Sequence, residues 1–213
     1  MDPTERAASL SAQIADENRL GALRKRAKDL GVDHELGLAL WSTGVASARR
    51  LAILLLDKAR CDQELVDGLD RDLKDLSFDE RTQLMDWLLA NQLAKTAAGR
   101  RLMDSWEHSA SPLQRRTFWY QQARLRWTGQ APPPNSEHLL AALEARLADE
   151  EPEVQWAMNF AAGQIGTFEP EHRARCVALG ETTGLYRDEA VSRGCTPNYL
   201  PEFIRIQAEK HST

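Results

Sequence analysis

The apolar residues of this chain recur with the spacing of a helix almost throughout. Between residues 45 and 57 they stand three or four positions apart, at Val45, Ala48, Ala52 and Leu55. The leucines between residues 62 and 76 repeat this spacing, which places them on one face of a helix. β-branched residues nowhere gather in the alternating pattern that a strand requires. The sequence therefore predicts an all-α protein.

Capping and turn residues divide this helical pattern into segments. Asp33 and Ser111 are of the residue types that cap helix N-termini, and Pro112 suits the first helical position. Gly31 follows the last apolar residue of its segment, as glycine does at helix C-termini. Three consecutive prolines predict a loop at residues 129–135. We expect helices at residues 4–18, 20–30, 33–41, 45–57 and 62–76, and one that begins at residues 77–79 and contains Asp86. A short helix should follow Gly99 and end near residue 106. Further helices are expected at residues 111–127, 136–148, 152–166 and 169–183, with a short one through 203 and 206.

Helices of this length joined by short turns favour an array of antiparallel helix pairs. The pairs recur about every 35 to 45 residues, which is the range of HEAT-like repeats. We therefore expect a curved solenoid, a HEAT-like or ARM-type superhelix, that forms a single domain over residues 1–213. Turn residues accumulate at about residues 184–201 and predict an irregular C-terminal strap there.

Several classes of protein are disfavoured by the composition. The three cysteines are far apart and the five histidines never stand at ligand spacing, so we expect neither a disulfide framework nor a metal site. No glycine-rich phosphate loop is present, and no cofactor is expected. The longest apolar run, residues 51–56, is far shorter than the roughly 20 residues of a membrane helix. Residues 1–6 lack the basic start of a secretory signal. We expect a soluble, cytoplasmic monomer without a membrane partner.

Charge is segregated along the chain. The net charge is −5, but residues 91–127 hold seven basic and two acidic residues, a local net charge of +5. Just before this basic segment, Asp86 interrupts the apolar run of residues 84–89, where a solvated carboxylate has little reason to be. Such an acid is either a partner in an ion pair or cap, or a group that takes part in chemistry. The arginines form either a solvated face or a set of phosphate contacts.

Several segments, taken in order, resemble the DNA alkylation repair glycosylases of the AlkD-like, HEAT-repeat family. The resemblance spans about Leu20 to Ile204. It rests on residues 20–28, 34–41, 48–52, 113–116, 154–160 with 165–166, and 194–199. The resemblance implies a solenoid whose concave, basic face holds double-stranded DNA. It also implies that the protein excises cationic N3- or N7-alkylated purines, such as 3-methyladenine and 7-methylguanine.

The resemblance also assigns residues to this chemistry. Family members have a tryptophan four residues before a catalytic aspartate, an arginine on a later helix and a second tryptophan on the helix after that. Asp86 matches the aspartate and Arg115 the arginine, whereas Thr82 and Phe160 stand where the tryptophans are expected. Asp86 would stabilise the oxocarbenium-like sugar and orient the attacking water. Arg115 would hold a flanking phosphate.

The other candidate DNA contacts are Arg116, Lys95, Arg100 and Arg101 for the backbone, and Trp87 and Trp119 for an aromatic wall that Thr82 does not supply. Two alternative functions stay open. The departures at Thr82 and Phe160 are consistent with a catalytically inactive paralogue that recognises bent or branched DNA. The acidic net charge is consistent with a helical-repeat scaffold for protein interactions. A DNA-binding protein of this kind is expected at the bacterial nucleoid.

Overall fold

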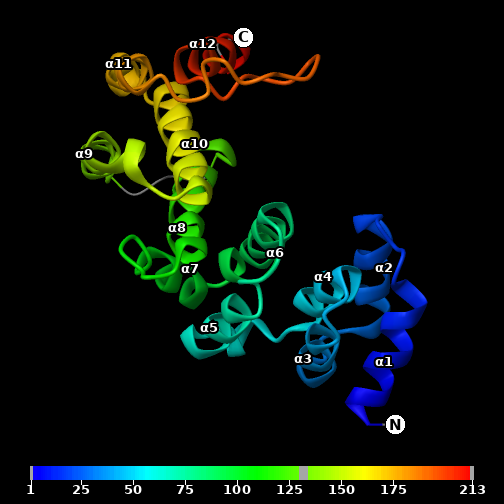
Figure 1. Cartoon of the computed structure of the whole chain (residues 1–213). Coiled ribbons are helices and arrows are strands. Elements are labelled where there is room, and N and C mark those ends of the chain that lie inside the picture. The colour runs from blue at the N-terminus through cyan, green and yellow to red at the C-terminus, as the bar shows by residue number, and fades with distance from the viewer. Residues whose placement is uncertain (1, 130–133, 212–213) are drawn as a thin grey trace. The chain divides into compact units, whose positions relative to one another are not determined.

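The computed structural model describes residues 2–129 and 134–211. Within these residues the regular secondary structure is entirely helical, with α-helices, short 3-10 turns and no strand, which confirms the all-α prediction (Figure 1). The helices group into two compact units, residues 1–106 and 107–213. We describe each unit by itself, and the single domain over residues 1–213 stays a prediction. Among the described residues, no helix is long and apolar enough to cross a bilayer.

Unit 1 contains seven α-helices among its described residues. They are α1 (Pro3–Ile14), α2 (Leu20–Leu30), α3 (His34–Ser42), α4 (Ala46–Leu55), α5 (Gln63–Arg71), α6 (Phe78–Asn91) and α7 (Ala97–Asp104), with 3-10 turns at Lys58–Arg60 and Leu93–Lys95. Helix α4 packs against α1, α2, α3 and α6, so it forms the centre of this unit. Most of its predicted core stripe is buried: Ala48, Ala52 and Leu55 are each 0% exposed, whereas Val45 is the half-buried residue that precedes the helix.

Helix boundaries in unit 1 follow the capping residues closely. The Asp33 side chain accepts a hydrogen bond from the Leu36 amide at 3.1 Å, and Gly31 ends α2 with a φ of 75°. The helix expected at residues 62–76 is shorter, because α5 ends at Arg71. Beyond it the chain tightens into a turn in which the amide of Leu73 bonds to the carbonyl of Asp70. Residue spacing alone does not reveal such a turn, since the leucines keep helical intervals through it.

Gly99 marks a close approach between α7 and the preceding 3-10 turn. A Cβ atom at this position would lie 2.3 Å from the carbonyl oxygen and 2.8 Å from the Cα of Leu93, which are backbone atoms with little freedom to move. We expect Gly99→Ala to lower the free energy of unfolding by about 2 kcal/mol. Urea unfolding would measure the change. Gly21→Ala in α2 is the control, because nothing lies within 4 Å of its Cβ position and alanine should stabilise that helix by about 0.5–1 kcal/mol. Equal effects at the two positions would contradict this reasoning.

Unit 2 is built on the long helices α8 and α10. Its α-helices are α8 (Pro112–Trp127), α9 (Ser136–Arg146), α10 (Pro152–Phe168), α11 (Arg173–Thr183) and α12 (Leu200–His211), with 3-10 turns at Leu147–Asp149 and Pro170–His172. Helix α10 packs against α8, α11 and α12. Its apolar stripe is 1% exposed or less at every position, at Val154, Ala157, Met158, Ala161 and Ile165. Residues 130–133 of the predicted loop lie outside the described residues, and no helix is found between residues 184 and 199.

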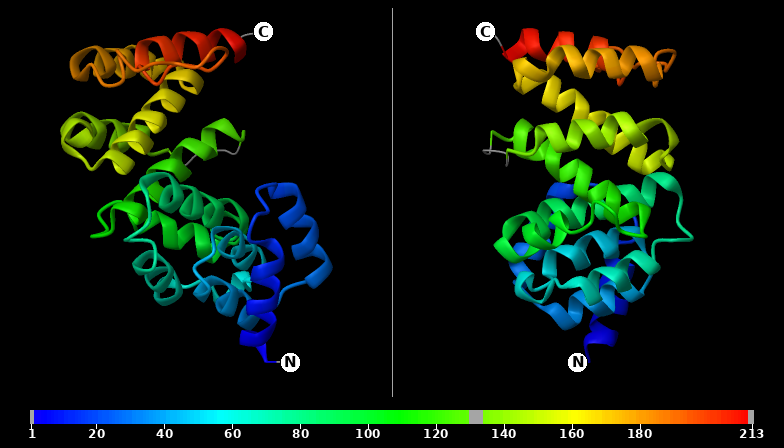
Figure 2. Two further views of the ribbon diagram at one scale, coloured as in Figure 1. Left: turned by 45° about the vertical axis from the view of Figure 1, so that its right-hand side comes forward. Right: turned by 90° about the vertical axis from the view of Figure 1, so that its left-hand side faces the viewer.

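Helix α10 passes Gly166, where we expected it to end, and continues to Phe168. Gly163 and Gly166 instead let α12 approach closely. A Cβ on Gly163 would lie 2.7 Å from the Phe203 ring, and one on Gly166 would lie 2.7 Å from Ile204 Cδ1. Because neither glycine has a side chain, Phe203 and Ile204 of α12 pack directly on the backbone of α10. Helix α12 lies against the C-terminal part of α10 (Figure 2).

Candidate functional site

Asp86 lines a pocket of unit 1 with a volume of about 500 Å³. Gln83, Asp86 and Trp87 stand at helical spacings of three and four, so α6 presents all of them on one face. The rest of the wall comes from the loop before α2, from the first residue of α2 and from α4. It consists of Asn18, Leu20 and Arg50. The structure thus places the predicted carboxylate, half-buried, in an open pocket beside an aromatic ring.

Trp87 is held in place by α4 and covered by α2. Its indole N–H donates a hydrogen bond of 3.0 Å to the backbone carbonyl of Arg50, which ties α6 to α4. The guanidinium of the exposed Arg24 lies 4.6 Å from the ring centroid, at cation–π distance. The Arg50 guanidinium in turn donates to the Gln83 side chain at 3.1 Å. The pocket therefore combines a carboxylate, an aromatic face that receives a cation, and two neighbouring arginines.

Thr82 takes no part in this pocket. It is 6% exposed, and its hydroxyl donates to the Phe78 carbonyl at 2.8 Å, one turn back along α6. Its position gives Thr82 almost no surface for a DNA contact. The aromatic wall beside Asp86 comes from Trp87, one of the two tryptophans named as candidates. The other, Trp119, is 0% exposed in the core of unit 2, which leaves its ring no surface for DNA.

The basic residues named from the second half of unit 1 lie apart from the pocket wall. Lys95 ends the 3-10 turn before α7, and Arg100 and Arg101 belong to α7 itself. All three are exposed, and Arg100 donates to the carbonyl of Ala94 at 3.0 Å. None of them is among the residues that line the Asp86 pocket. Their contact with DNA stays a prediction.

Arg115 belongs to unit 2 and is engaged by acids. Its guanidinium forms ion pairs with Glu150, at 3.1 Å, and with Glu151, and it donates to the Ser109 carbonyl at 2.8 Å. Burial acts to lower the pKa of Arg115, but the hydrogen bonds and charges of Glu151 and Glu150 outweigh it and raise the pKa. The pKa of Glu151 is lowered by a backbone hydrogen bond, by a hydrogen bond with Glu150 and then by the contacts with Arg115. The guanidinium that was predicted to bind a phosphate is thus already paired with the carboxylates of Glu150 and Glu151.

Arg116 points into the protein. It is 5% exposed, donates to the Glu153 carbonyl at 3.1 Å and lies 4.7 Å from the centroid of the Trp156 ring. Its position gives it a packing role on α8 and little surface for a phosphate.

Phe160 belongs to a cluster of aromatic rings in unit 2. Its ring stacks on Trp156, with centroids 5.3 Å apart and planes inclined by 13°. It also contacts Tyr120 at 5.8 Å, Trp127 at 6.4 Å and Phe203 at 5.9 Å. We call these five residues the aromatic cluster. Phe160 therefore replaces the expected tryptophan within a set of rings and does not stand alone.

The predicted site residues are divided between the two units. Thr82, Asp86, Trp87, Lys95, Arg100 and Arg101 belong to unit 1, and Arg115, Arg116, Trp119 and Phe160 belong to unit 2. Within unit 1 the structure brings Asp86 and Trp87 together. Arg24 and Arg50 were not among the predicted site residues, although both stand in segments that carry the family resemblance. The sequence does not show that Arg24 and Arg50 lie on the helix faces that are directed toward α6, so it could not identify them as site residues.

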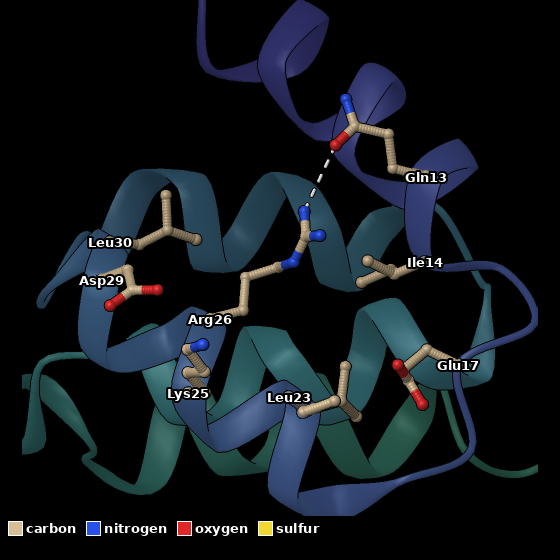
Figure 3. Close-up of a pocket in the computed structure, with 9 residues that line it drawn as sticks. Gln13, Ile14, Glu17, Leu23, Lys25, Arg26, Asp29 and Leu30 are labelled. Atoms are coloured by element: carbon tan, nitrogen blue, oxygen red, sulfur yellow. Dashed lines mark hydrogen bonds between the residues drawn. The ribbon is translucent and has the colours of Figure 1, made fainter.

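A second pocket of unit 1, of about 520 Å³, lies between α1 and α2 (Figure 3). Lys25 and Arg26 line it, but Glu17 and Asp29 do so as well, and Arg26 donates to Gln13 at 3.2 Å. The mixed charges give this pocket no preference for an anion. Among the described residues, Glu169, Glu171 and His172 are one group close enough to share a metal ion. Both Glu169 oxygens already accept hydrogen bonds, however, from Arg126 and Ser136.

Comparison with known proteins agrees with this structure. A protein-family model described as "DNA alkylation repair enzyme" matches residues 18–191. One similar solved structure is described as "a new family of proteins related to the HEAT-like repeat DNA glycosylases with affinity for branched DNA structures". It superposes with a TM-score of 0.65 over 98% of this chain and 88% of that chain, at 16% sequence identity. This likeness confirms the predicted HEAT-like helical fold. No curated protein matches the sequence.

Proposed function

The chain belongs to the family of DNA alkylation repair enzymes, and from this premise we propose that it is a DNA glycosylase for cationic N3- or N7-alkylated purines in duplex DNA. The observation that carries the proposal is the pocket in which Asp86 stands beside Trp87. An alkylated purine is positively charged, so its glycosidic bond is weakened and the base leaves without a strong general acid. The protein then has to stabilise charge on the sugar, which a carboxylate can do.

Asp86 and Trp87 have complementary roles in this mechanism. As the base departs, positive charge develops on the deoxyribose, and a fixed carboxylate lowers the energy of that transition state. The same carboxylate can orient the water that attacks the sugar. The Arg24 guanidinium lies over the face of Trp87, and a cationic base would be attracted to that face in the same way once Arg24 has moved from it to a DNA phosphate. Arg24 and Arg50 would contact the flanking phosphates.

Base release from methylated DNA tests the proposal directly. The full-length protein is incubated with duplex DNA that carries 3-methyladenine and 7-methylguanine, and the freed bases are separated and measured. Release that is proportional to enzyme concentration supports the proposal. No release above the spontaneous rate contradicts it.

Binding of branched DNA without excision is the second candidate function. Thr82 stands buried where the resemblance implies an aromatic group, and Arg115 is held by two acids. The description of the similar solved structure, a family related to the HEAT-like repeat DNA glycosylases and with affinity for branched DNA structures, favours the same candidate. Tighter binding of a four-way junction than of a duplex, with no base released, would support it. The affinity should fall steeply between about 50 and 200 mM salt. Absence of any nucleic-acid binding would favour a protein-interaction scaffold instead.

Glu150 and Glu151 hold Arg115 in competition with a DNA phosphate. We expect Glu150→Gln/Glu151→Gln to tighten duplex binding and to steepen the dependence of log Kd on log salt concentration by about 1, the equivalent of one added phosphate contact. Fluorescence anisotropy at a series of salt concentrations would measure both. Glu181→Gln/Glu202→Gln removes the same charge from exposed positions of unit 2. Equal slopes for the two double variants would show that Arg115 does not bind a phosphate.

A further inference from the structure

Trp127, the last residue of α8, is the most exposed of the six tryptophans. It is 50% exposed, whereas Trp41, Trp106 and Trp119 are 4% exposed or less. A large aromatic ring that stays in water gives up the stabilisation of burial. The proposed DNA glycosylase mechanism uses the Asp86 pocket of unit 1. It does not involve the Trp127 indole, which belongs to unit 2.

The exposed ring has a fixed orientation. Trp127 meets Phe160 edge to face, with centroids 6.4 Å apart and planes inclined by 79°. Phe160 is itself stacked on Trp156 and lies 5.8 Å from Tyr120. The Phe160 ring, which is itself packed among the other rings of the aromatic cluster, therefore restrains the Trp127 indole before a flat ligand binds. Such preorganisation favours binding because less freedom is lost.

An arginine stands one turn before Trp127 on the same helix. The Arg124 guanidinium lies 6.0 Å from the centroid of the Trp127 ring. The other three arginines of α8 are engaged: Arg115 and Arg126 form ion pairs with glutamates, and Arg116 is buried. No acidic partner of Arg124 is found in the part of the chain that the structure describes, and its Nε atom is buried without a hydrogen-bond partner. This cation is thus available beside an exposed aromatic ring.

We propose that Trp127 and Arg124 form a binding site for an unpaired base of single-stranded DNA. The base stacks on the Trp127 indole, and Arg124 contacts the adjoining phosphate. Alternation of aromatic rings with a cation is the arrangement by which proteins hold single strands without reading their sequence. The inference rests on the proposed DNA binding, but it uses unit 2 alone and does not require Asp86. It assigns the protein an affinity for gaps, flaps or open junctions in addition to duplex DNA.

The test is binding of the full-length protein to a fluorescent oligothymidylate of about 12 nucleotides, which is within the range of single-strand site sizes. Trp127→Ala is expected to weaken binding roughly 10-fold, because one stacked base is lost. Trp127→Phe retains a ring and should stay within about 3-fold of the wild type. A strand of the same length made of abasic sites has the phosphates without the bases. It should bind the wild type as weakly as the oligothymidylate binds Trp127→Ala.

Three further measurements make the outcome decisive. Arg124→Gln should reduce the salt slope of oligothymidylate binding by about 1, which keeps the proposal testable even if Trp127→Ala folds poorly. Base release from methylated duplex should be unchanged in Trp127→Ala, and Asp86→Asn should bind the oligothymidylate as the wild type does, so failure of the glycosylase proposal and failure of this one are distinguishable. Equal binding by wild type and Trp127→Ala, equal binding of the abasic strand, or tighter binding of an oligouridylate RNA would each overturn the single-stranded DNA site.

Discussion

Asp86→Asn is expected to reduce the rate of base release from methylated duplex DNA by about 10²- to 10³-fold. The amide has nearly the shape of the carboxylate, so the pocket beside Trp87 should keep its form. It lacks the negative charge, however, and cannot stabilise the positive sugar in the transition state. Single-turnover measurement of 7-methylguanine release would give the rate of the chemical step without a contribution from product dissociation.

A matched substitution separates this electrostatic effect from a general loss of charge. Asp75 is exposed in the turn that follows α5, and Asp75→Asn changes the net charge by the same amount. Release by Asp75→Asn should equal that of the wild type, and both variants should bind unmodified duplex normally. A change of less than about threefold in Asp86→Asn would remove Asp86 from the chemistry and leave DNA binding as the better description of the protein.

Arg126→Ala is expected to lower the free energy of unfolding by about 3 kcal/mol. The Arg126 side chain is 1% exposed and donates to Glu169, to the Gln122 carbonyl at 2.9 Å and to Ser136 at 2.7 Å. Its removal leaves the mostly buried Glu169 carboxylate without its cation, and it frees three acceptors from their donor. The shift of the urea midpoint at constant m value would measure the loss.

Two comparisons identify the cause of that loss. Arg205→Ala makes the same change in the exposed ion pair between Arg205 and Glu209 on α12, and it should cost no more than about 0.5 kcal/mol. Adding Glu169→Gln to Arg126→Ala removes the uncompensated charge and should restore part of the stability. Equal losses in Arg126→Ala and Arg205→Ala would mean that burial of the ion pair does not matter.

The fold was predictable from the sequence where local signals determine it. Ser77 and Ser111 cap α6 and α8 through hydrogen bonds to amides three residues ahead, which is a short-range interaction that residue type indicates well. Gly166 was misread because the sequence shows a glycine but not the helix packed against it. Its role depends on Ile204, which lies far along the chain.

The candidate site was less predictable for the same reason. Asp86 could be singled out because an acid in an apolar run is locally unusual. The ion pairs of Arg115 join it to residues about 35 positions away, and the burial of Trp119 is set by the helices around it. Arginines and tryptophans occur both in cores and on binding faces, so residue type alone does not decide between the two environments.

The hydrogen bond from Trp87 to the Arg50 carbonyl determines how the Asp86 pocket can respond to a ligand. It joins two helices that also pack against each other, so it restrains Trp87 and the neighbouring carboxylate relative to Arg50. A pocket restrained in this way closes little around its ligand. For a DNA ligand, the bending and unstacking must then occur in the double helix itself. The protein would then bind preferentially to damaged sites where the DNA deforms easily, before any contact distinguishes one base from another.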